Sequence, residues 1–254
     1  MVGMFPFTHG ILGAGGFQTA AANFDGVTDT IARGADMTGN ADSNTLVFSA
    51  FLRLGTTLGA MGVDQVVWAN EGAFTRIRIT TANQIVAIVQ SSTTIGFTTF
   101  CNIQSTGTIS STNGWQHIGL SCNGSSFALM RNGTTDWSSS AFVSTLTADW
   151  TRTDHWFGSG DGSTSNVLNA DVAEVFLHTS TYIDLRSNIT LFRDSAGKPV
   201  NLGTSGATPT GSQPIVYFQR AVGATASTFA ANLGTGGAFT ITGALTNSTS
   251  SPSD

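Results

Sequence analysis

The stretch that decides the fold runs from Asn113 to Gly133 and has the sequence NGWQHIGLSCNGSSFALMRNG. It consists of two short apolar runs on either side of Asn123-Gly124, a pair that tolerates the positive φ angles of tight hairpin turns. Alternate residues are apolar, namely Ile118, Leu120 and Cys122 in the first run and Phe127 and Leu129 in the second. A period of two on both sides of a turn signal predicts a β-hairpin.

The composition of the whole chain favours strands over helices. Only 10% of the 254 residues are charged, compared with roughly 25% in ordinary globular proteins. One lysine, Lys198, and two glutamates, Glu71 and Glu174, are present, so the long charged side chains that favour helices are scarce. Thr, Val, Ile and Phe are plentiful, as is typical of strands. The length suits one large all-β domain or two small ones.

Charge and hydropathy argue against two classes of partner. The formal net charge is −5, so we expect no nucleic-acid surface. No run of about 18 apolar residues occurs, so we expect no membrane span. Cys101 and Cys122 are too few for a disulfide framework. Both lie in strand-like runs, where two buried thiols or a disulfide between neighbouring strands would fit.

Strand-like segments separated by clusters of Gly, Asn, Ser and Thr recur along the chain. They cover residues 45–53, 65–69, 74–80, 85–90, 96–103, 115–122, 126–131, 155–157, 171–178, 214–219 and 237–242. This spacing predicts a sandwich or a barrel, with a single short helix near 184–193. Segments 85–90 and 171–178 are apolar on both faces, so loops or another subunit must cover the face that points away from the core.

The two ends of the chain differ from the central part. Residues 1–20 form an apolar arm, interpreted either as a frayed terminus or extra edge strand, or as a tether that docks into another subunit. The docking residues would be Phe5, Phe7, Ile11 and Leu12. We expect residues 21–246 to form one domain and the polar tail 247–254 to fray.

Several segments resemble laminin-G-like, concanavalin A-like jelly-roll domains. Residues 23–53 are similar to the opening of these domains, in which F-D-G and an Asp precede a strand of the type F-T-I-S-A-W. Residues 114–120 and 127–133 resemble their W-H-H-V-A-L and V-x-L-Y-V-D-G strands, and 169–176 resemble the late strand F-N-G-D-I-D-E-V. The resemblance implies an all-β, antiparallel two-sheet jelly-roll sandwich of the concanavalin A type. It implies no particular activity.

The C-terminal third carries a second resemblance. Residues 192–203, 209–211 and 232–243 are similar to the ending of such domains in virion proteins of tailed bacteriophages. This implies a structural protein of a phage particle. Strands 214–219 and 237–242 would complete the sandwich and bring the last strand near the first.

No catalytic constellation stands out. Glycanases of this fold carry E-x-D-x-x-E on one strand, and the nearest equivalent here is Asn169-x-Asp171-x-x-Glu174. Asn169 cannot act as a carboxylate nucleophile, so we expect no enzyme, with a polysaccharide hydrolase dependent on Glu174 as a remote alternative. No G-x-S-x-G elbow or H-x-x-x-H spacing occurs. His117 belongs to the hairpin and is interpreted as a packing residue.

Calcium and carbohydrate are the remaining ligands to consider. Asp25, Asp29, Asp36 and Asp161 lie in loops; they could bind Ca²⁺, although turn-forming aspartates that bond their own backbone explain them as well. Trp137, Trp150 and Trp156 lie near Asp154 and Asp161 in the sequence. They could bind a sugar ring or cap the open end of the sandwich. We expect no bound cofactor or metal.

These observations lead to two hypotheses about function. The first is a non-enzymatic structural protein on the exterior of a tailed-phage virion, as a capsid decoration, fibre or tail component. It would dock onto other virion proteins through the arm and an apolar sheet face and form a homo-oligomer. The alternative is a carbohydrate-binding, lectin-like module that attaches to host-surface glycans.

Overall fold

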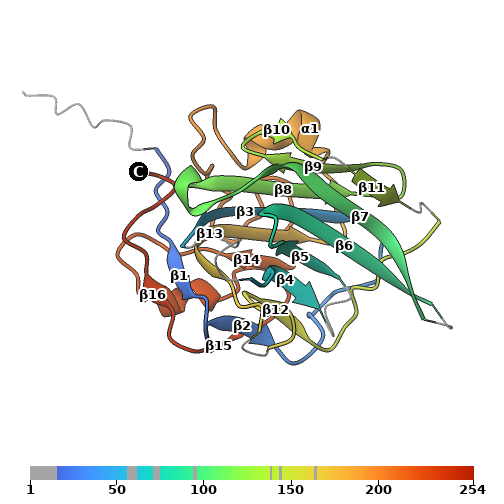
Figure 1. Cartoon of the computed structure of the whole chain (residues 1–254), viewed down its shortest axis with the longest axis horizontal. Coiled ribbons are helices and arrows are strands. Elements are labelled where there is room, and N and C mark those ends of the chain that lie inside the picture. Colours follow the sequence, from blue (N-terminus) through green and yellow to red (C-terminus); the bar gives the residue numbers. More distant parts are fainter. Residues whose placement is uncertain are drawn as a thin grey trace, which may run out of the picture.

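A computed structural model of the protein describes residues 16–55, 62–70, 75–93, 96–137, 139–142, 145–162 and 165–254. In this part of the chain, two antiparallel eight-stranded sheets pack face to face around an apolar core (Figure 1). The predicted all-β, two-sheet jelly-roll sandwich is therefore confirmed. The four predicted docking residues Phe5, Phe7, Ile11 and Leu12 lie outside the described residues.

The first sheet contains the hairpin. Its strands follow the order β10 (Thr134–Thr135), β9 (Phe127–Arg131), β8 (Gln116–Cys122), β3 (Leu46–Leu54), β13 (Asn169–His178), β1 (Ala22–Asp25) and β16 (Thr246–Asn247). An eighth strand, β14 (Val216–Phe218), pairs with the second half of β13, while β1 pairs with its first half. Two strands that are far apart in the sequence therefore share one edge of β13.

The second sheet packs on the first. Its order is β11 (Ser139–Phe142), β7 (Gly96–Thr108), β6 (Gln84–Thr93), β5 (Arg76–Ile79), β4 (Gln65–Asn70), β12 (His155–Phe157), β2 (Thr30–Arg33) and β15 (Thr240–Thr242). β15 pairs with β2 and β16 pairs with β1. The end of the chain thus lies against its beginning, as the sequence predicts.

Helical structure in the described residues is short. The expected helix near 184–193 consists of α1 (Leu185–Asn188) followed by a 3₁₀ turn at Ile189–Leu191. Asp184 caps α1, because its carboxylate accepts the Arg186 N–H at 3.0 Å. Further 3₁₀ turns occur at Ser111–Asn113 and Ala226–Ala230. No helix in the described ranges has the length and apolar character of a membrane span.

The core between the sheets is rich in phenylalanine. Phe24 and Phe157 meet edge to face with ring centroids 5.6 Å apart, and Phe218 meets Phe157 at 6.0 Å. Cys101 on β7 and Cys122 on β8 belong to the same core as buried, unpaired thiols. A hydrogen bond to Cys101, together with burial, raises the pKa of Cys122. Of the two interpretations that the sequence allowed for these cysteines, the structure shows two buried thiols.

The predicted hairpin is formed by β8 and β9, but its turn differs from the prediction. Neither Asn123 nor Gly124 has a positive φ. The Asn123 side-chain oxygen instead accepts the backbone N–H groups of Ser125 and Ser126, which closes the turn. Positive φ angles occur at Asn132-Gly133 (52° and 83°), where β9 turns into β10. The hairpin prediction is right, and the residues with unusual backbone angles lie one turn later.

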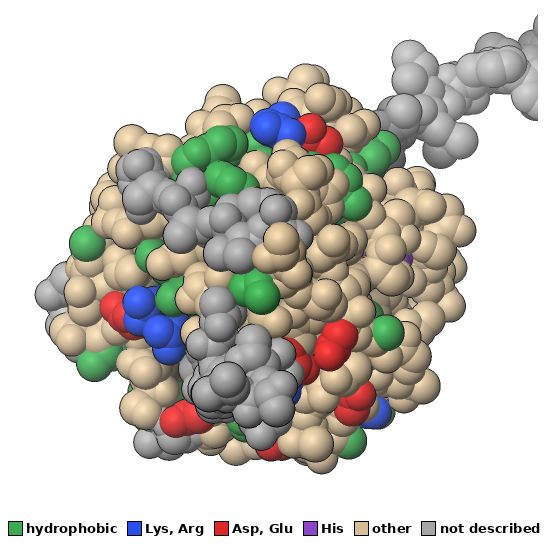
Figure 2. Space-filling model, turned by 90° about the vertical axis from the view of Figure 1, so that its right-hand side faces the viewer, with side chains coloured by type: hydrophobic (Ala, Val, Ile, Leu, Met, Phe, Trp, Pro, Cys, Tyr) green, Lys and Arg blue, Asp and Glu red, His purple; other side chains and the backbone are tan. Residues whose placement is uncertain are grey.

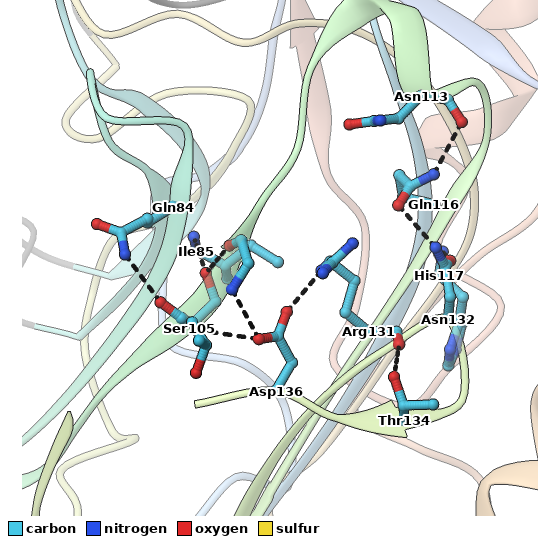
Figure 3. A network of polar contacts seen from close by, with 12 residues as sticks. Gln84, Ile85, Ser105, Asn113, Gln116, His117, Arg131, Asn132, Thr134 and Asp136 are labelled. Atoms are coloured by element: carbon cyan, nitrogen blue, oxygen red, sulfur yellow. Dashed lines mark hydrogen bonds and ion pairs between the residues drawn. The ribbon is translucent and has the colours of Figure 1, made fainter. Parts of the chain in front are cut away.

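Polar side chains fix the open end of this hairpin (Figure 3). The Asn132 side chain accepts the His117 N–H and donates to Gln116 Oε1 at 2.7 Å. Asp136 accepts two backbone N–H groups of β7, in the second sheet, and the side-chain Nε–H of Arg131 on β9. Asp136 therefore ties one sheet to the other at this edge.

The outer face of the first sheet is covered by the chain after β13. Phe176 on β13 is fully buried there, with its ring centroid 5.1 Å from that of Phe192. Leu185 of α1, Leu202 and Tyr217 belong to the same buried cluster. The apolar outer face of segment 171–178 is thus covered within the chain. The expectation that this apolar sheet face docks onto another protein is wrong for this strand.

The polar tail is part of the folded structure. Ser253 is 2% exposed, and its hydroxyl accepts the Thr19 N–H at 3.1 Å. Ser251 donates its hydroxyl hydrogen to the Thr19 carbonyl at 2.5 Å. The expectation that residues 247–254 fray is wrong, because these side chains satisfy the backbone of the entering N-terminal segment. Thr19 is 1% exposed, although the sequence assigned it to the arm 1–20.

Candidate functional site

The predicted glycan-binding tryptophans lie in separate places. Trp150 is fully buried, and its indole N–H donates to Ser43 Oγ at 3.1 Å, so the prediction for Trp150 is wrong. Trp137 is half-buried against Phe127, with ring centroids 5.6 Å apart. Trp156 on β12 is also half-buried, but it belongs to an outer face. Of these three tryptophans, Trp156 alone combines partial exposure with polar neighbours suited to a ligand.

Trp156 lies in a row of side chains across the outer face of the second sheet. Phe157, next to it in β12, is in the core, so alternation directs Trp156 outward. In the sheet register Trp156 is opposite Ala69 of β4, and Ala69 is opposite Arg76 of β5. Because Ala69 contributes only a methyl group, no large side chain separates the indole from the guanidinium along this row.

The loop that follows β12 lies beside Trp156. Gly158 accepts the Leu168 N–H at 2.9 Å, and Asn166 accepts the Val66 N–H at 3.0 Å, so the ends of the loop are anchored to each other and to β4. Gly162 has a φ of 74°, and a Cβ at this position would lie 2.8 Å from Trp156 Nε1. Glycine therefore allows the loop to approach the edge of the indole.

A polar cavity of about 140 Å³ lies between this loop and strands β4 and β5. It is lined by Asp64, Val66, Arg76, Arg78, Gly160, Asp161 and Asn166. Arg78 forms an ion pair with Asp64. Arg76 Nε is buried without a hydrogen-bond partner. Burial, and then the positive charge of Arg78, lowers the pKa of Arg76, while Asp64 opposes this shift.

The cavity and Trp156 together offer the contacts that a carbohydrate needs. An indole presents an apolar face to the C–H groups of a sugar ring, whereas guanidinium, carboxylate and amide groups bind hydroxyls. The sequence identified Trp156, which lies on β12, and Asp161, which lies in the loop after β12. It did not identify Arg76 or Asn166. Asp154 lies just before β12, near Gly34, and does not line the cavity.

The remote glycanase hypothesis depends on Glu174, which is inaccessible. A β-bulge in β13 gives Glu174 a φ of 51° and buries it to 2% exposure. Its carboxylate accepts hydrogen bonds from the hydroxyls of Thr19 at 2.6 Å and Tyr217 at 2.8 Å. Burial raises the pKa of Glu174 to about 7 despite these bonds. Asp171, the other carboxylate of the pattern, is ion-paired with Arg53.

His117 has the packing role expected from the sequence. It is 1% exposed, it contacts the ring of Phe51, and its Nε2 is 2.9 Å from Ser49 Oγ. Burial, with a smaller contribution from Arg193, lowers the pKa of His117 to about 3, so the imidazole is neutral at physiological pH.

Two of the four aspartates considered for calcium, Asp25 and Asp29, accept backbone N–H groups. The Asp25 carboxylate accepts the N–H groups of Val27, Thr28 and Asp29. Burial raises the pKa of Asp25, but these bonds outweigh it and the net shift is downward. Asp36 and Asp161 lie elsewhere in the fold. Within the described ranges, no three His, Cys, Asp or Glu side chains form a group that could hold a metal ion.

Comparison with known proteins gives similarity in fold alone. No protein-family model matches the chain, and no curated protein matches its sequence. A Bacteroides ovatus structure described as a "putative carbohydrate binding protein" superimposes with a TM-score of 0.53 at 15% identity. The alignment covers 79% of this chain and 51% of that one, so the chain spans about half the length of this relative.

Two further structures match less well. Domains LG4-5 of the mouse laminin α1 chain align at 11% identity, with a TM-score of 0.44 and coverage of 67% of this chain and 47% of that one. The binding domain of botulinum neurotoxin DC, in complex with rat synaptotagmin II, aligns at 11% identity with a TM-score of 0.43. That alignment covers 66% of this chain and 44% of the toxin domain.

Proposed function

We propose that the protein is a non-enzymatic carbohydrate-binding module whose ligand lies against Trp156 and the neighbouring polar cavity. One observation carries the proposal. A partly exposed indole lies in the same row as Arg76, and a glycine-containing loop with Asp161 and Asn166 borders both. The Bacteroides ovatus structure supports the proposal only as a fold that is associated with carbohydrate binding.

The polar groups of the site suit an uncharged or weakly charged sugar. Arg78 is already paired with Asp64, so its charge is largely compensated. Arg76 Nε has no described hydrogen-bond acceptor, so it can donate to a ligand. Asp161 is exposed at the rim of the cavity. On the face drawn in Figure 2, charged side chains form only small groups among uncharged ones.

The test is binding to an array of bacterial and animal surface glycans, followed by titration with the strongest ligand. Trp156→Ala should weaken binding at least tenfold, and Arg76→Gln should weaken it less. Trp137→Ala is the matched control, because Trp137 packs against Phe127 away from this cavity. An array without any bound glycan, or equal losses in Trp156→Ala and Trp137→Ala, would contradict the proposal.

A second proposal concerns the setting: a displayed component of a tailed-phage virion. The resemblance of the C-terminal third supports it, and so does the position of the chain entry. Thr19 lies on the outer face of the first sheet, bonded to Glu174, whereas Trp156 lies on the outer face of the second. A segment preceding Thr19 that is bound to a capsid or tail would therefore leave the Trp156 face free.

The virion proposal is tested by incorporation into particles. Deletion of residues 2–16 should abolish incorporation while the purified domain keeps its β-sheet circular dichroism spectrum and its unfolding transition. Normal incorporation of the deletion variant would show that the arm does not dock the protein.

A further inference from the structure

A second polar cavity has a volume of about 460 Å³. It is bounded by the start of the hairpin, by the loop after the 3₁₀ turn at Ile189–Leu191, and by the C-terminal segment. Its principal side chains are Asn113, Trp115, Gln116, Asn132, Arg193, Lys198 and Asp254. The volume lies within the range of small-molecule sites.

Two cations of this cavity have no carboxylate partner in the described chain. Five of the eight other basic residues form described ion pairs with aspartates, namely Arg53, Arg78, Arg131, Arg152 and Arg186. Arg193 Nε is buried without a partner, and Arg193 Nη1 reaches only the Asp194 carbonyl at 3.5 Å. Lys198, the single lysine, donates to the Ser253 carbonyl at 2.6 Å, which satisfies a hydrogen bond without neutralising the charge.

The loop at Gly197 lies close against the Arg193 guanidinium. Gly197 has a φ of 91°, and a Cβ at this position would lie 2.7 Å from Arg193 Nη2. The loop can therefore fold directly over the guanidinium only because residue 197 is glycine. A guanidinium without a described carboxylate partner is suited to bidentate binding of a carboxylate.

The remaining walls of the cavity supply amides and an indole edge. Gln116 and Asn132 are joined by a hydrogen bond of 2.7 Å, which fixes the orientation of both amides. Trp115 is held by its N–H to Ser250 Oγ at 2.9 Å, with the Arg53 guanidinium over its ring. The one carboxylate of the lining, Asp254, is exposed and accepts the Ser251 N–H at 2.7 Å. Its charge is therefore directed to a backbone group and to solvent.

We propose that this cavity binds the carboxylate of an acidic sugar, a hexuronate or a related sugar acid. Arg193 and Lys198 hold the carboxylate, and the amides of Asn113, Gln116 and Asn132 line the space for the hydroxyl groups. The site is separate from the Trp156 cavity, since the two have no lining residue in common. The two sites can therefore be tested independently.

The test uses ¹⁵N-labelled full-length protein titrated with methyl glucuronide and, as the matched neutral probe, methyl glucoside. Glucuronide should shift the Trp115 indole and Arg193 Nε signals and bind at least tenfold more tightly than glucoside. Arg193→Gln should weaken glucuronide binding at least tenfold. Arg33→Gln, at a partly buried arginine that is bonded to backbone carbonyls at another site, should leave it unchanged. Trp156→Ala should also leave it unchanged, which separates this site from the proposed function.

Three results would overturn the inference. They are equal binding of glucuronide and glucoside, unchanged glucuronide binding in Arg193→Gln, and equal affinity for glucuronide and N-acetylglutamate, which would indicate an acidic peptide in place of a sugar. If Arg193→Gln fails to fold, Lys198→Gln serves the same purpose. Lys198 lies on the cavity wall, and the expected loss there is several-fold.

Discussion

The two outer faces of the sandwich differ in how far other parts of the chain cover their apolar strands. Strands β13 and β6 were both predicted to be apolar on two sides. On β13 the outer residue Phe176 is fully buried by the C-terminal third of the chain, whereas on β6 the outer residue Ile88 is only partly buried. The polar row that includes Arg76 and Trp156 crosses the same face as Ile88. Covering one face with the chain itself leaves the other available for ligands.

The largest expected effect comes from opening the covered face. Phe176→Ala removes a buried ring that contacts Phe192 and should lower the free energy of unfolding by about 3–5 kcal/mol. Ile88→Ala on the other face should cost about 1 kcal/mol or less, because this side chain is partly exposed already. Urea unfolding followed by tryptophan fluorescence measures both. Equal losses would show that the two faces are equally covered.

The second prediction concerns pH and the buried carboxyl of the covered face. The pKa of Glu174 is about 7 in the folded protein and 4.5 in the unfolded chain, so ionisation costs more in the folded state. The unfolding free energy should fall by about 3 kcal/mol as pH rises from 4.5 to 7, and then level off. Below pH 4.5 Glu174 is protonated in both states and has no effect.

A variant isolates this pH dependence. Glu174→Gln is neutral at every pH, so its unfolding free energy should lack the fall between pH 4.5 and 7 and exceed that of the parent at pH 8. Asp64→Asn, on the open face, keeps Glu174 and should keep the fall. A Glu174→Gln curve parallel to that of the parent protein would refute the assignment.

The third prediction concerns the C-terminal segment, residues 250–254. Deletion of residues 250–254 removes the bonds from Ser251 and Ser253 to Thr19 and from Ser250 to Trp115. With about 0.5–1.5 kcal/mol for each hydrogen bond, the expected loss is about 2–3 kcal/mol. Thermal and urea unfolding measure it. An unchanged stability would mean that this segment frays in solution, as the sequence suggested.

The smallest expected effect is on the open face. Trp156→Ala should change the free energy of unfolding by about 1 kcal/mol or less, since the indole lies on an outer face, is partly exposed and has the small Ala69 as its neighbour. The same variant should lose ligand binding. The effect of this substitution on binding should therefore be large while its effect on stability is small. A loss comparable to that of Phe176→Ala would indicate a structural role for Trp156.

Alternating apolar residues were enough to predict most long strands and the hairpin. Short strands such as β1 and β2 were not predicted, because residues 22–25 and 30–33 are paired by long-range contacts and lack a local pattern of their own. Trp150 and Trp156 are six residues apart and look alike in sequence. Only the strands that pack beside them decide that Trp150 is buried and Trp156 lies partly exposed on an outer face.

The site also contains residues that the sequence could have indicated. Arg76 and Arg78 alternate with Ile77 and Ile79, which places two cations on the outer side of one strand. Their proximity to Asp161 could not be predicted, because it depends on the register of β5, β4 and β12. The same holds for Arg193 in the second cavity, which reaches the hairpin from a loop distant in the sequence.

The shared edge of β13 has a consequence for how the chain folds. β1 and β14 complete that edge from opposite ends of the sequence, and β16 then pairs with β1. During synthesis the edge stays partly unpaired until residues 216–247 have left the ribosome, and an unpaired edge can pair with other chains. Folding should therefore be slow and vulnerable to aggregation in its last steps, with the C-terminal segment as the element that ends that exposure.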